Sequence, residues 1–240
     1  MLIFSRQTDM IDWFAFCTFD LTGDLAFGET FGCLDTGKYH RWVSICTDSI
    51  RGFTIATACK YYPALDWLLQ RLIPQSLREQ EYYHYAHTVE KVQRRLGLEK
   101  QRMDFMTPFV EAKDKPGAER MSMDEIFCSF GFLIIAGSET TTVTMAGITN
   151  YLVQNTDVLR ELEDEVRARY QSDVEITMDS LKELEYLDAV VKEGMRLCNA
   201  IPAGIPRIVS DSGTTICGQY VPGKVSVAYR AMMLLRVAMS

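Results

Sequence analysis

The stretch Ala136-Gly137-Ser138-Glu139-Thr140-Thr141 follows directly on a strongly apolar segment, residues 126–135, and the two together decide the fold. The apolar segment is hydrophobic on nearly every side, which is typical of a helix in the core of a protein. Ser122 and Glu125 stand three residues apart and form the pattern of a capping box. The sequence therefore predicts one central helix over residues 122–152.

The polar residues in the middle of this helix need a separate explanation. A glycine in a helix costs about 1 kcal/mol relative to alanine, and an unpaired buried carboxylate costs more. Gly137, Glu139 and the threonines after them would therefore weaken a helix that served stability alone. Two interpretations stay open. Either something approaches the backbone at a functional site, or the threonine hydroxyls bond back to carbonyls of their own helix.

Length, charge and cysteine content limit the class of protein. The chain has 240 residues, 48% of them hydrophobic, which suffices for one core and suggests one or two domains. Its net charge of −7 offers no basic surface, so we expect no nucleic-acid partner. Seven cysteines without a C-x-x-C pair favour reduced thiols in a cytosol-facing protein. Without a secretory signal or an uninterrupted apolar run of roughly 18 residues, we expect no membrane anchor in this chain.

Helix and strand signals predict a mainly α-helical protein with a small β component near the C-terminus. Thr156 is expected to cap the helix that follows the central one, and a capping box at Ser180 and Glu183 is expected to begin the next. Residues 97–120 are expected to be mostly loop. The expected helices cover residues 9–20, 40–59, 64–72, 75–96, 122–152, 156–170 and 180–197, and the expected strands residues 207–209, 215–217 and 225–227.

A second motif, Lys192-Glu193-Gly194-Met195-Arg196, places Glu193 and Arg196 where their side chains can pair on one face of a helix. Alone, such an E-x-x-R pattern indicates only a surface ion pair. Here it follows A-G-x-E-T-T and an amphipathic helix, and it precedes Pro206-Arg207-Ile208-Val209. In this order the motifs resemble the haem-thiolate monooxygenases of the cytochrome P450 superfamily. The resemblance covers about residues 9–227, is closest to filamentous-fungal members over residues 18–28, and leaves residues 228–240 as a divergent tail.

The resemblance implies a haem cofactor and assigns the polar cluster of the central helix to its oxygen side. In the family this helix crosses the distal face of the haem. Ala136 and Gly137, which have little or no side chain, would let the porphyrin lie close to the helix backbone. Thr141 would belong to the same contact. Thr140 would hold dioxygen and its water by hydrogen bond, and Glu139 would relay protons, which suits a carboxylic acid beside a hydroxyl in a dry pocket.

The resemblance also assigns roles outside the central helix. Glu193 and Arg196 would form a structural ion pair on the proximal side of the haem. Arg207 matches the position that usually reaches a haem propionate, because a guanidinium offers a carboxylate two donors in one plane. An ordinary surface arginine at the start of a strand is the alternative interpretation of Arg207.

The chain departs from the family on the side of the haem opposite to the central helix. The family supplies a cysteine thiolate there, in a late F-x-x-G-x-R-x-C-x-G loop, and that ligand drives O–O cleavage. No such loop occurs in the 240 residues. Cys217 lacks the Phe, Gly and Arg before it, and Cys33 lacks the arginine and precedes the central helix. We therefore expect no metal ligand, an incomplete cytochrome P450 fold as a single partial domain over residues 1–240, and no activity of this chain by itself.

The expected function by family is a haem-dependent monooxygenase that hydroxylates a hydrophobic small molecule in fungal secondary metabolism, with a reductase as partner. Aromatic residues such as Trp42 and Trp67 favour a hydrophobic substrate, although a core role explains them equally well. Two alternatives stay open: an internal fragment of a longer active monooxygenase, and a non-enzymatic helical protein that binds a partner through exposed apolar surface. As given, the chain would be cytosolic, whereas family members are usually anchored to a membrane and face the cytosol.

Overall fold

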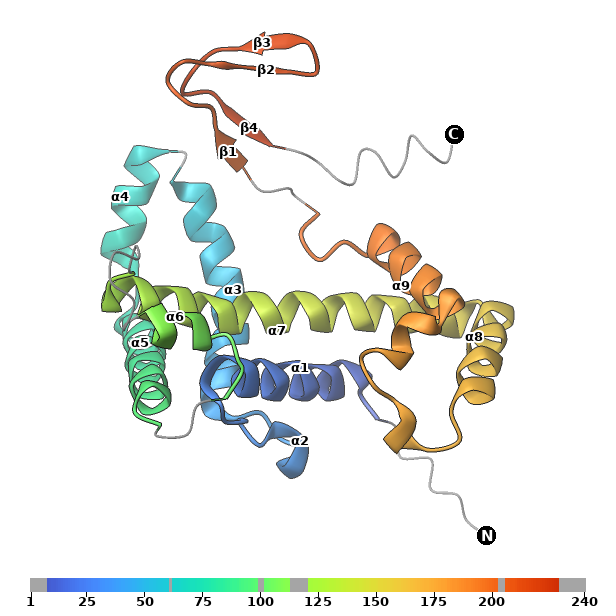
Figure 1. The fold of residues 1–240 in the computed structure, drawn as a ribbon. Helices are drawn as coiled ribbons and strands as arrows, with labels where there is room; N and C mark the ends of the chain where they lie inside the picture. The colour runs from blue at the N-terminus through green and yellow to red at the C-terminus, as the bar shows by residue number, and fades with distance from the viewer. Residues whose placement is uncertain (1–7, 61, 99–101, 113–120, 203–205, 229–240) are drawn as a thin grey trace. The chain divides into compact units, whose positions relative to one another are not determined.

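The computed structural model of the chain describes residues 8–60, 62–98, 102–112, 121–202 and 206–228 (Figure 1). These residues are mainly helical, with short strands near the C-terminal end, as the sequence predicts. The chain divides into two compact units, residues 1–142 and 143–240, and helix α7 (Met123–Gln154) contributes to both. The single partial domain expected over residues 1–240 stays a prediction. Most of the divergent tail, residues 229–240, lies outside the described residues.

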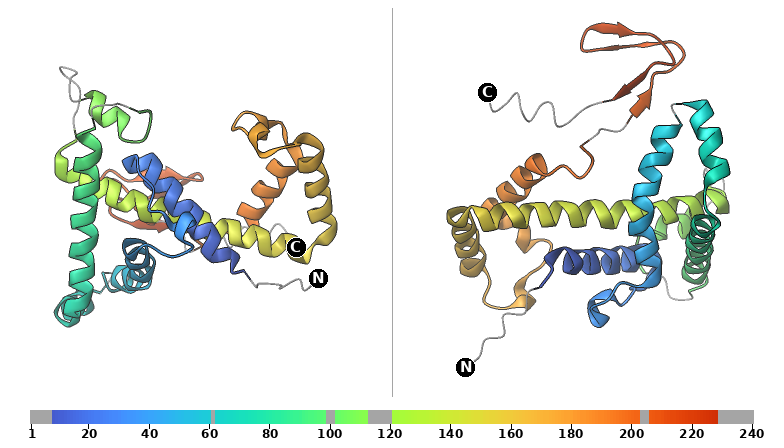
Figure 2. Two further views of the ribbon diagram at one scale, coloured as in Figure 1. Left: turned by 90° about the horizontal axis from the view of Figure 1, so that it is seen from below. Right: turned by 180° about the vertical axis from the view of Figure 1, so that it is seen from behind.

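The first unit is a helical assembly in which α1 lies against α7 (Figures 1 and 2). Three of its helices fall within one residue of the predicted bounds, and α6 interrupts the loop expected over residues 97–120. Besides the N-terminal part of α7, the unit contains α1 (Met10–Phe27), α2 (Cys33–Thr36), α3 (Arg41–Cys59), α4 (Pro63–Leu72), α5 (Gln75–Leu96) and α6 (Thr107–Ala112).

Helix α1 is longer than the sequence predicts. We expected glycines to break the helix after residue 20, but Gly23 lies inside it. A Cβ atom at Gly23 would lie 2.8 Å from the phenyl ring of Phe31, so the glycine admits the returning chain. The helix ends at Gly28, whose φ of +76° is the left-handed conformation that glycine adopts without strain.

The buried carboxylate of Asp20, in the middle of α1, ties this helix to the start of α2. It accepts hydrogen bonds from the backbone N–H groups of Phe31 at 3.0 Å, Cys33 at 3.1 Å and Leu34 at 2.9 Å. The amides of Cys33 and Leu34 belong to the first turn of α2, where no carbonyl of the helix can accept from them. A single side chain of α1 therefore fixes the path of residues 29–34.

A buried ion pair joins α5 to the segment before α6. Arg95 donates to Asp104 from Nε at 2.7 Å and from Nη2 at 3.1 Å, and both side chains are fully buried. Burial alone would raise the pKa of Asp104, but the hydrogen bond and charge of Arg95, with hydrogen bonds from Thr107 and the Met106 amide, hold it below its usual value. This pair fixes the C-terminal end of α5 in the first unit.

The second unit combines the C-terminal part of α7 with two helices and two strand pairs. Strands β1 and β4 are antiparallel, with Arg207 opposite Val227, and β2 and β3 are antiparallel, with Thr215 opposite Tyr220. The sequence predicted three of these strands and missed β3. The elements are α8 (Thr156–Arg169), 3₁₀ turns at Asp173–Glu175 and Ser180–Glu183, α9 (Glu185–Leu197), β1 (Pro206–Ile208), β2 (Thr214–Ile216), β3 (Gln219–Val221) and β4 (Ser226–Ala228).

Both helix starts predicted in the second unit are wrong in detail. Asn155, not Thr156, occupies the cap position of α8, and its side chain makes no capping hydrogen bond. Residues 180–183 form a separate 3₁₀ turn, and α9 begins after it at Glu185. The carboxylate of Glu165 on α8 instead accepts from the amides of Tyr186 at 2.8 Å and Leu187 at 2.9 Å. A residue distant in sequence therefore provides the cap.

The central helix has the predicted start. Ser122 and Glu125 form the capping box, with the Ser122 amide donating to the Glu125 carboxylate at 2.7 Å and the Glu125 amide donating to Ser122 Oγ at 3.3 Å. Burial is less complete than expected, because Cys128 is exposed and Phe132 is 66% exposed. Among the described residues, α7 is the one helix whose length and apolar composition would also suffice to cross a membrane, and core helices of soluble proteins meet the same criteria.

Candidate functional site

Helix α7 has a buried face and a partly open face in the first unit. Ile134, Ser138 and Thr142 follow one another at four-residue intervals and are at most 3% exposed. Ala136 and Thr140 are each displaced about 160° around the helix from Ser138, so both point away from the buried face. Both are partly exposed. The predicted site residues Ala136 and Thr140 therefore share a face on which a ligand could lie.

The threonines of the A-G-S-E-T-T stretch bond back to their own helix. Thr140 Oγ1 donates to the Ala136 carbonyl at 2.7 Å, and Thr141 Oγ1 donates to the Gly137 carbonyl at 2.8 Å. The second interpretation made from the sequence is thus confirmed for these hydroxyls. It does not remove the first, since a hydroxyl that donates one hydrogen bond still has lone pairs that can accept another.

Gly137 and Thr141 do not share the face of Ala136 and Thr140. A Cβ atom at Gly137 would lie 3.3 Å from Thr22 Cγ2 of α1, which is tighter than an ordinary contact. The glycine therefore permits the close approach of α1. Thr141 is exposed and lies about 60° around the helix from the buried Ser138. The contacts of Gly137 and Thr141 with a cofactor stay predictions.

Glu139 has the electrostatic character of a group that exchanges protons. Its side chain is half-buried, and burial raises its pKa above the ordinary value of 4.5. No residue in the described part of the chain donates a hydrogen bond to its carboxylate. The phenol of Tyr39 lies close enough to Glu139 to feel its charge. Burial is the main cause that raises the pKa of this phenol. Its hydrogen bond to Asp12 at 2.8 Å and the charges of Asp12 and Glu139 act in the same direction. A carboxyl group whose pKa is raised by burial is a candidate for a functional site.

Glu193 and Arg196 form the ion pair that the E-x-x-R motif predicts. Arg196 Nε donates to Glu193 Oε2 at 2.7 Å. That hydrogen bond is the main reason that the pKa of Glu193 falls and the pKa of Arg196 rises. The two side chains are 55% and 37% exposed, respectively, and pair with no third charged group among the described residues. An exposed pair adds little stability, so its structural role in the family stays a prediction here.

Arg207 lies on β1 with its side chain exposed. Its Nη1 donates to the carbonyl of the preceding Pro206 at 3.0 Å, and it forms no ion pair with a described residue. Both interpretations of Arg207 from the sequence, a propionate contact and an ordinary surface arginine, remain compatible with this geometry.

Cys33 and Cys217 have different surroundings in the structure. Cys33 is buried, and burial together with the nearby charge of Asp20 raises the pKa of its thiol, so the protonated form is favoured. Cys217 is exposed in the turn between β2 and β3, at a φ of +49°. Within the described ranges, no three His, Cys, Asp or Glu side chains gather in a way that could hold a metal ion.

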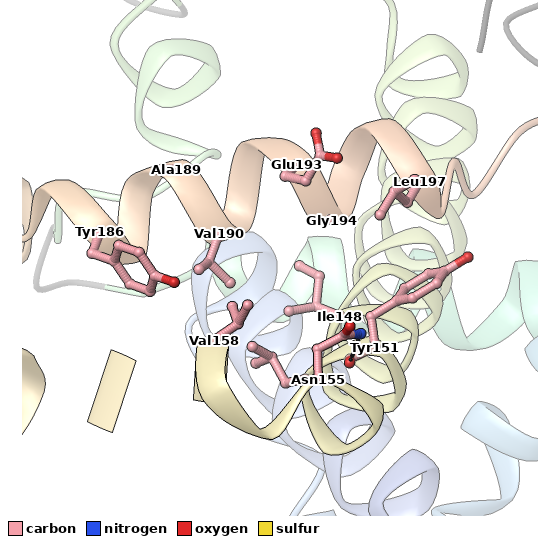
Figure 3. A pocket seen from close by; sticks show the side chains of 11 residues that line it. Ile148, Tyr151, Asn155, Val158, Tyr186, Ala189, Val190, Glu193, Gly194 and Leu197 are labelled. Atoms are coloured by element: carbon pink, nitrogen blue, oxygen red, sulfur yellow. Dashed lines mark hydrogen bonds between the residues drawn. The ribbon is translucent and has the colours of Figure 1, made fainter. Parts of the chain in front are cut away.

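The second unit contains an open, mainly apolar pocket of about 400 Å³ between the C-terminal part of α7, α8 and α9 (Figure 3). Ile148, Val158 and Val190 point toward one another there, whereas the carboxylate of Glu193 points away. This pocket was not predicted from the sequence, because its lining comes from three helices that come together only in the folded chain. None of the catalytic or cofactor residues predicted from the sequence lines it.

Trp42, considered as part of a substrate surface, has a core role. Its side chain is fully buried, and its indole N–H donates to His84 Nδ1 at 2.7 Å. Trp67 is 57% exposed, and the guanidinium of Arg71 lies over its ring at 4.1 Å. Neither tryptophan carries an argument about substrate.

Comparison with known families gives one decisive match. The family model described as Cytochrome P450 matches residues 4–236 of this chain. The chain belongs to the cytochrome P450 family. Similar curated proteins of this family come from fungi. The cytochrome P450 monooxygenase astJ of Aspergillus oryzae is 39% identical over 224 residues, which are 93% of this chain and 44% of that protein. The averantin hydroxylase of Dothistroma septosporum is 36% identical over 220 residues, 92% of this chain and 41% of that protein.

The match to solved structures agrees with the family. The crystal structure of the cytochrome P450DA heme domain superposes with a TM-score of 0.77 at 18% identity, covering 98% of this chain and 50% of that one. At this identity the likeness establishes the fold. The chain spans less than half the length of the curated relatives that it matches.

The residues of this cytochrome P450 chain fit a haem on one side only. The partly open face of α7 carries the small side chain of Ala136 next to Thr140, with the half-buried Glu139 beside them. A small side chain next to a hydroxyl is compatible with the flat cofactor and oxygen ligand that the family implies. The donor set for the opposite side, a cysteine in a glycine- and arginine-containing loop, does not occur in the 240 residues.

Proposed function

We propose that this chain forms the oxygen-facing side of a haem monooxygenase site. The observation that carries the proposal is Glu139: a half-buried carboxylate with a raised pKa and no described donor, next to Thr140 on the partly open face of α7. A buried acid in this position lowers the stability of the fold. Active sites nevertheless contain such acids, because proton delivery requires them. Its place in the motif order of the family supports the same assignment.

Each residue has a distinct task in this proposal. Haem, when bound, would supply the oxidising chemistry. Ala136 leaves room for the cofactor because its side chain is a single methyl group. Thr140 donates its hydroxyl proton to the Ala136 carbonyl at 2.7 Å, and its hydroxyl oxygen accepts a hydrogen bond from a bound water. Glu139 holds a proton more readily than an ordinary carboxylic acid and passes it to that water.

The substrate and partner classes follow from the family. We propose a hydrophobic small molecule as substrate and a reductase as electron donor. The names of the fungal relatives, a hydroxylase of averantin among them, support a place in secondary metabolism. For the chain itself we propose a cytosol-facing location.

We further propose that the 240 residues, taken alone, are inactive. The missing cysteine loop supports this, as does the raised pKa of Cys33, which disfavours a thiolate at the buried cysteine. The competing proposal is that these residues belong to a longer, active monooxygenase. Sequencing the transcript across both ends of the reading frame separates the two, because only the longer protein continues into F-x-x-G-x-R-x-C-x-G.

A chimera tests the oxygen-side function directly. In the Aspergillus oryzae relative, the matched 224-residue segment is replaced by the corresponding residues of this chain. Each protein is given haem, reduced under carbon monoxide and examined by absorption spectroscopy. We expect the chimera to show the Soret band of a thiolate-ligated haem and the 240 residues alone to lack it. That band from the 240 residues would overturn the missing ligand. A chimera that shows the band and consumes NADPH but yields only hydrogen peroxide would overturn the oxygen-side function.

A further inference from the structure

Four buried hydroxyls join α1 to the site-bearing turn of α7. Thr18 and Thr22 lie on α1, Ser138 and Thr142 lie on α7, and all four are at most 8% exposed. Thr18 Oγ1 and Thr142 Oγ1 are 2.7 Å apart, and Ser138 Oγ donates to the Thr18 carbonyl at 3.5 Å. Thr22 Oγ1 donates to that same carbonyl at 2.7 Å. The hydrogen bonds therefore converge on Thr18.

The proton count at Thr18 and Thr142 shows that the two hydroxyls act as a unit. Thr18 Oγ1 also lies 3.1 Å from the Ala15 carbonyl, and Thr142 Oγ1 lies 3.0 Å from the Ser138 carbonyl. Two hydroxyl protons thus serve three contacts. Whichever hydroxyl donates to the other, the second hydroxyl still donates to its own helix carbonyl, and the carbonyl that loses its hydroxyl still accepts the backbone hydrogen bond of its helix. The contact between the helices is satisfied in both arrangements.

We propose that Thr18 is a positioning residue for Glu139 and Thr140, an inference that rests on the proposed function of those two residues. Ser138 and Thr142 bracket them on α7, and both hydroxyls bond to Thr18. Hydrogen bonds are directional, so this double contact fixes the rotation of α7 about its own axis. With Ser138 held toward α1, Thr140 points about 160° away and Glu139 about 100° away.

The packing of α1 against α7 next to these hydroxyls favours the same rotational orientation of α7. The backbone at Gly137 approaches Thr22 so closely that a Cβ atom would lie 3.3 Å from Thr22 Cγ2. A purely apolar contact of the same shape, with both hydroxyls replaced, would be nearly as stable, since removing both partners of a hydrogen bond can be close to neutral. It would also tolerate small rotations, which would turn Glu139 toward α1 or toward water. The hydrogen bonds of the hydroxyls instead hold α7 in one rotational orientation.

The test uses the 240-residue chain without haem and compares Thr18→Val with Thr18→Ser. Valine keeps the volume and removes the hydroxyl, whereas serine keeps the hydroxyl. The first measurement is hydrogen exchange of the backbone amides of residues 136–142 by mass spectrometry. We expect Thr18→Val to speed this exchange about fivefold, the value of roughly one net hydrogen bond, and Thr18→Ser to leave it near the wild-type rate. Thr142→Val should act in the same way if Thr18→Val fails to fold.

The second measurement is the titration of Glu139, followed by NMR of the labelled carboxyl carbon. The positioning role predicts that Thr18→Val lowers the pKa of Glu139 toward its ordinary value, because a loosened turn admits water, and that Thr18→Ser does not. A purely structural role of Thr18 would lower global stability without this selective shift.

Thr88→Val is the matched control. Thr88 is 1% exposed and lies where a Cβ atom at Gly131 of α7 would be 3.3 Å from its hydroxyl, but it donates to its own helix, to the His84 carbonyl at 2.9 Å. We expect no change at residues 136–142 in this variant. Uniformly faster exchange throughout Thr18→Val, an unchanged titration of Glu139, or failure of Thr18→Ser to behave as wild type would each overturn the proposal. Such a result would leave the haem spectrum of the chimera, and with it the proposed function, unaffected.

Discussion

The burial of Glu139 suits the proposed proton delivery but lowers the stability of the fold when the carboxyl group is charged. A carboxylate whose folded pKa is raised favours the folded state while it is protonated and loses that advantage as the pH rises through the folded pKa. Below the unfolded value, near 4.5, Glu139 is protonated in both states and costs nothing. Above it, folding must either retain the proton or bury part of a charge.

The corresponding prediction concerns Glu139→Gln. We expect this variant to equal the wild type in stability near pH 4 and to exceed it at pH 7, because glutamine is neutral throughout. Urea midpoints of the two proteins measured from pH 4 to pH 8 give the difference, which should grow as the pH rises through the folded pKa of Glu139. Glu125→Gln is the control of opposite sign, since the Ser122 amide lowers the pKa of that exposed carboxyl. A stability difference that is constant with pH would contradict the raised pKa.

The buried pair of Arg95 and Asp104 makes a second residue-scale prediction. Asp104→Asn removes one charge and leaves the guanidinium buried without compensation, which typically costs about 3–5 kcal/mol. Arg95 tolerates this poorly, because its Nη1 already has no hydrogen-bond partner within the described structure. Chemical unfolding should therefore show a large loss of stability. Glu90→Gln is the control. It breaks a pair with Arg94 that is about half exposed on both sides, and we expect less than about 0.5 kcal/mol.

At the scale of elements, helix ends show how a cap can come from another helix. The carboxylate of Glu165 on α8 caps α9 by accepting two of its first amides. Glu165→Ala should cost about 1 kcal/mol, the usual value of a helix cap, and it should speed amide exchange at the start of α9. Glu163→Ala on the same helix is the control, since among the described residues Glu163 pairs with the exposed Arg167 alone. Equal effects of the two substitutions would argue against a capping role for Glu165.

The elements predicted correctly from the sequence are those whose signals are local. The capping box of Ser122 and Glu125 lies within one helical turn and is observed, as are the bounds of α5. The errors have a common cause in distant contacts. Gly23 remains helical because the ring of Phe31 packs against it, and α9 starts late because its cap is twenty residues upstream at Glu165.

The candidate site likewise has features that the local sequence predicts and features that depend on distant contacts. Residues 136–141 could be identified from their composition and order, because a glycine, an acid and threonines are costly in an apolar helix. Which of them point toward α1 could not be predicted, since the answer depends on Thr18 and Thr22 more than a hundred residues earlier. Only Ala136, Glu139 and Thr140 remain on or beside the open face, while Gly137 serves the helix contact.

At the scale of the whole molecule, the chain contains the proposed oxygen-side residues, and its 240 residues contain no cysteine loop of the family's pattern. The chain spans less than half the length of these curated relatives, and the proposed activity requires a thiolate-bearing segment as well. The chimera provides that segment and allows the two sides to be judged separately. Substitutions on α7 then report on proton delivery without affecting the iron ligand.

Thr140→Ala in the chimera is the prediction that decides between proton delivery and mere packing. In the proposed function the Thr140 hydroxyl holds the water that receives the proton from Glu139. We therefore expect NADPH consumption to continue in this variant, while product formed per NADPH falls roughly a hundredfold and hydrogen peroxide takes its place. Thr149→Ala is the control, because Thr149 bonds back to the Met145 carbonyl on the same helix at 2.9 Å and lies outside the predicted site. Equal product yields from the two variants would assign Thr140 to helix packing alone. An unchanged carbon monoxide spectrum in both variants would show that any loss arises on the oxygen side.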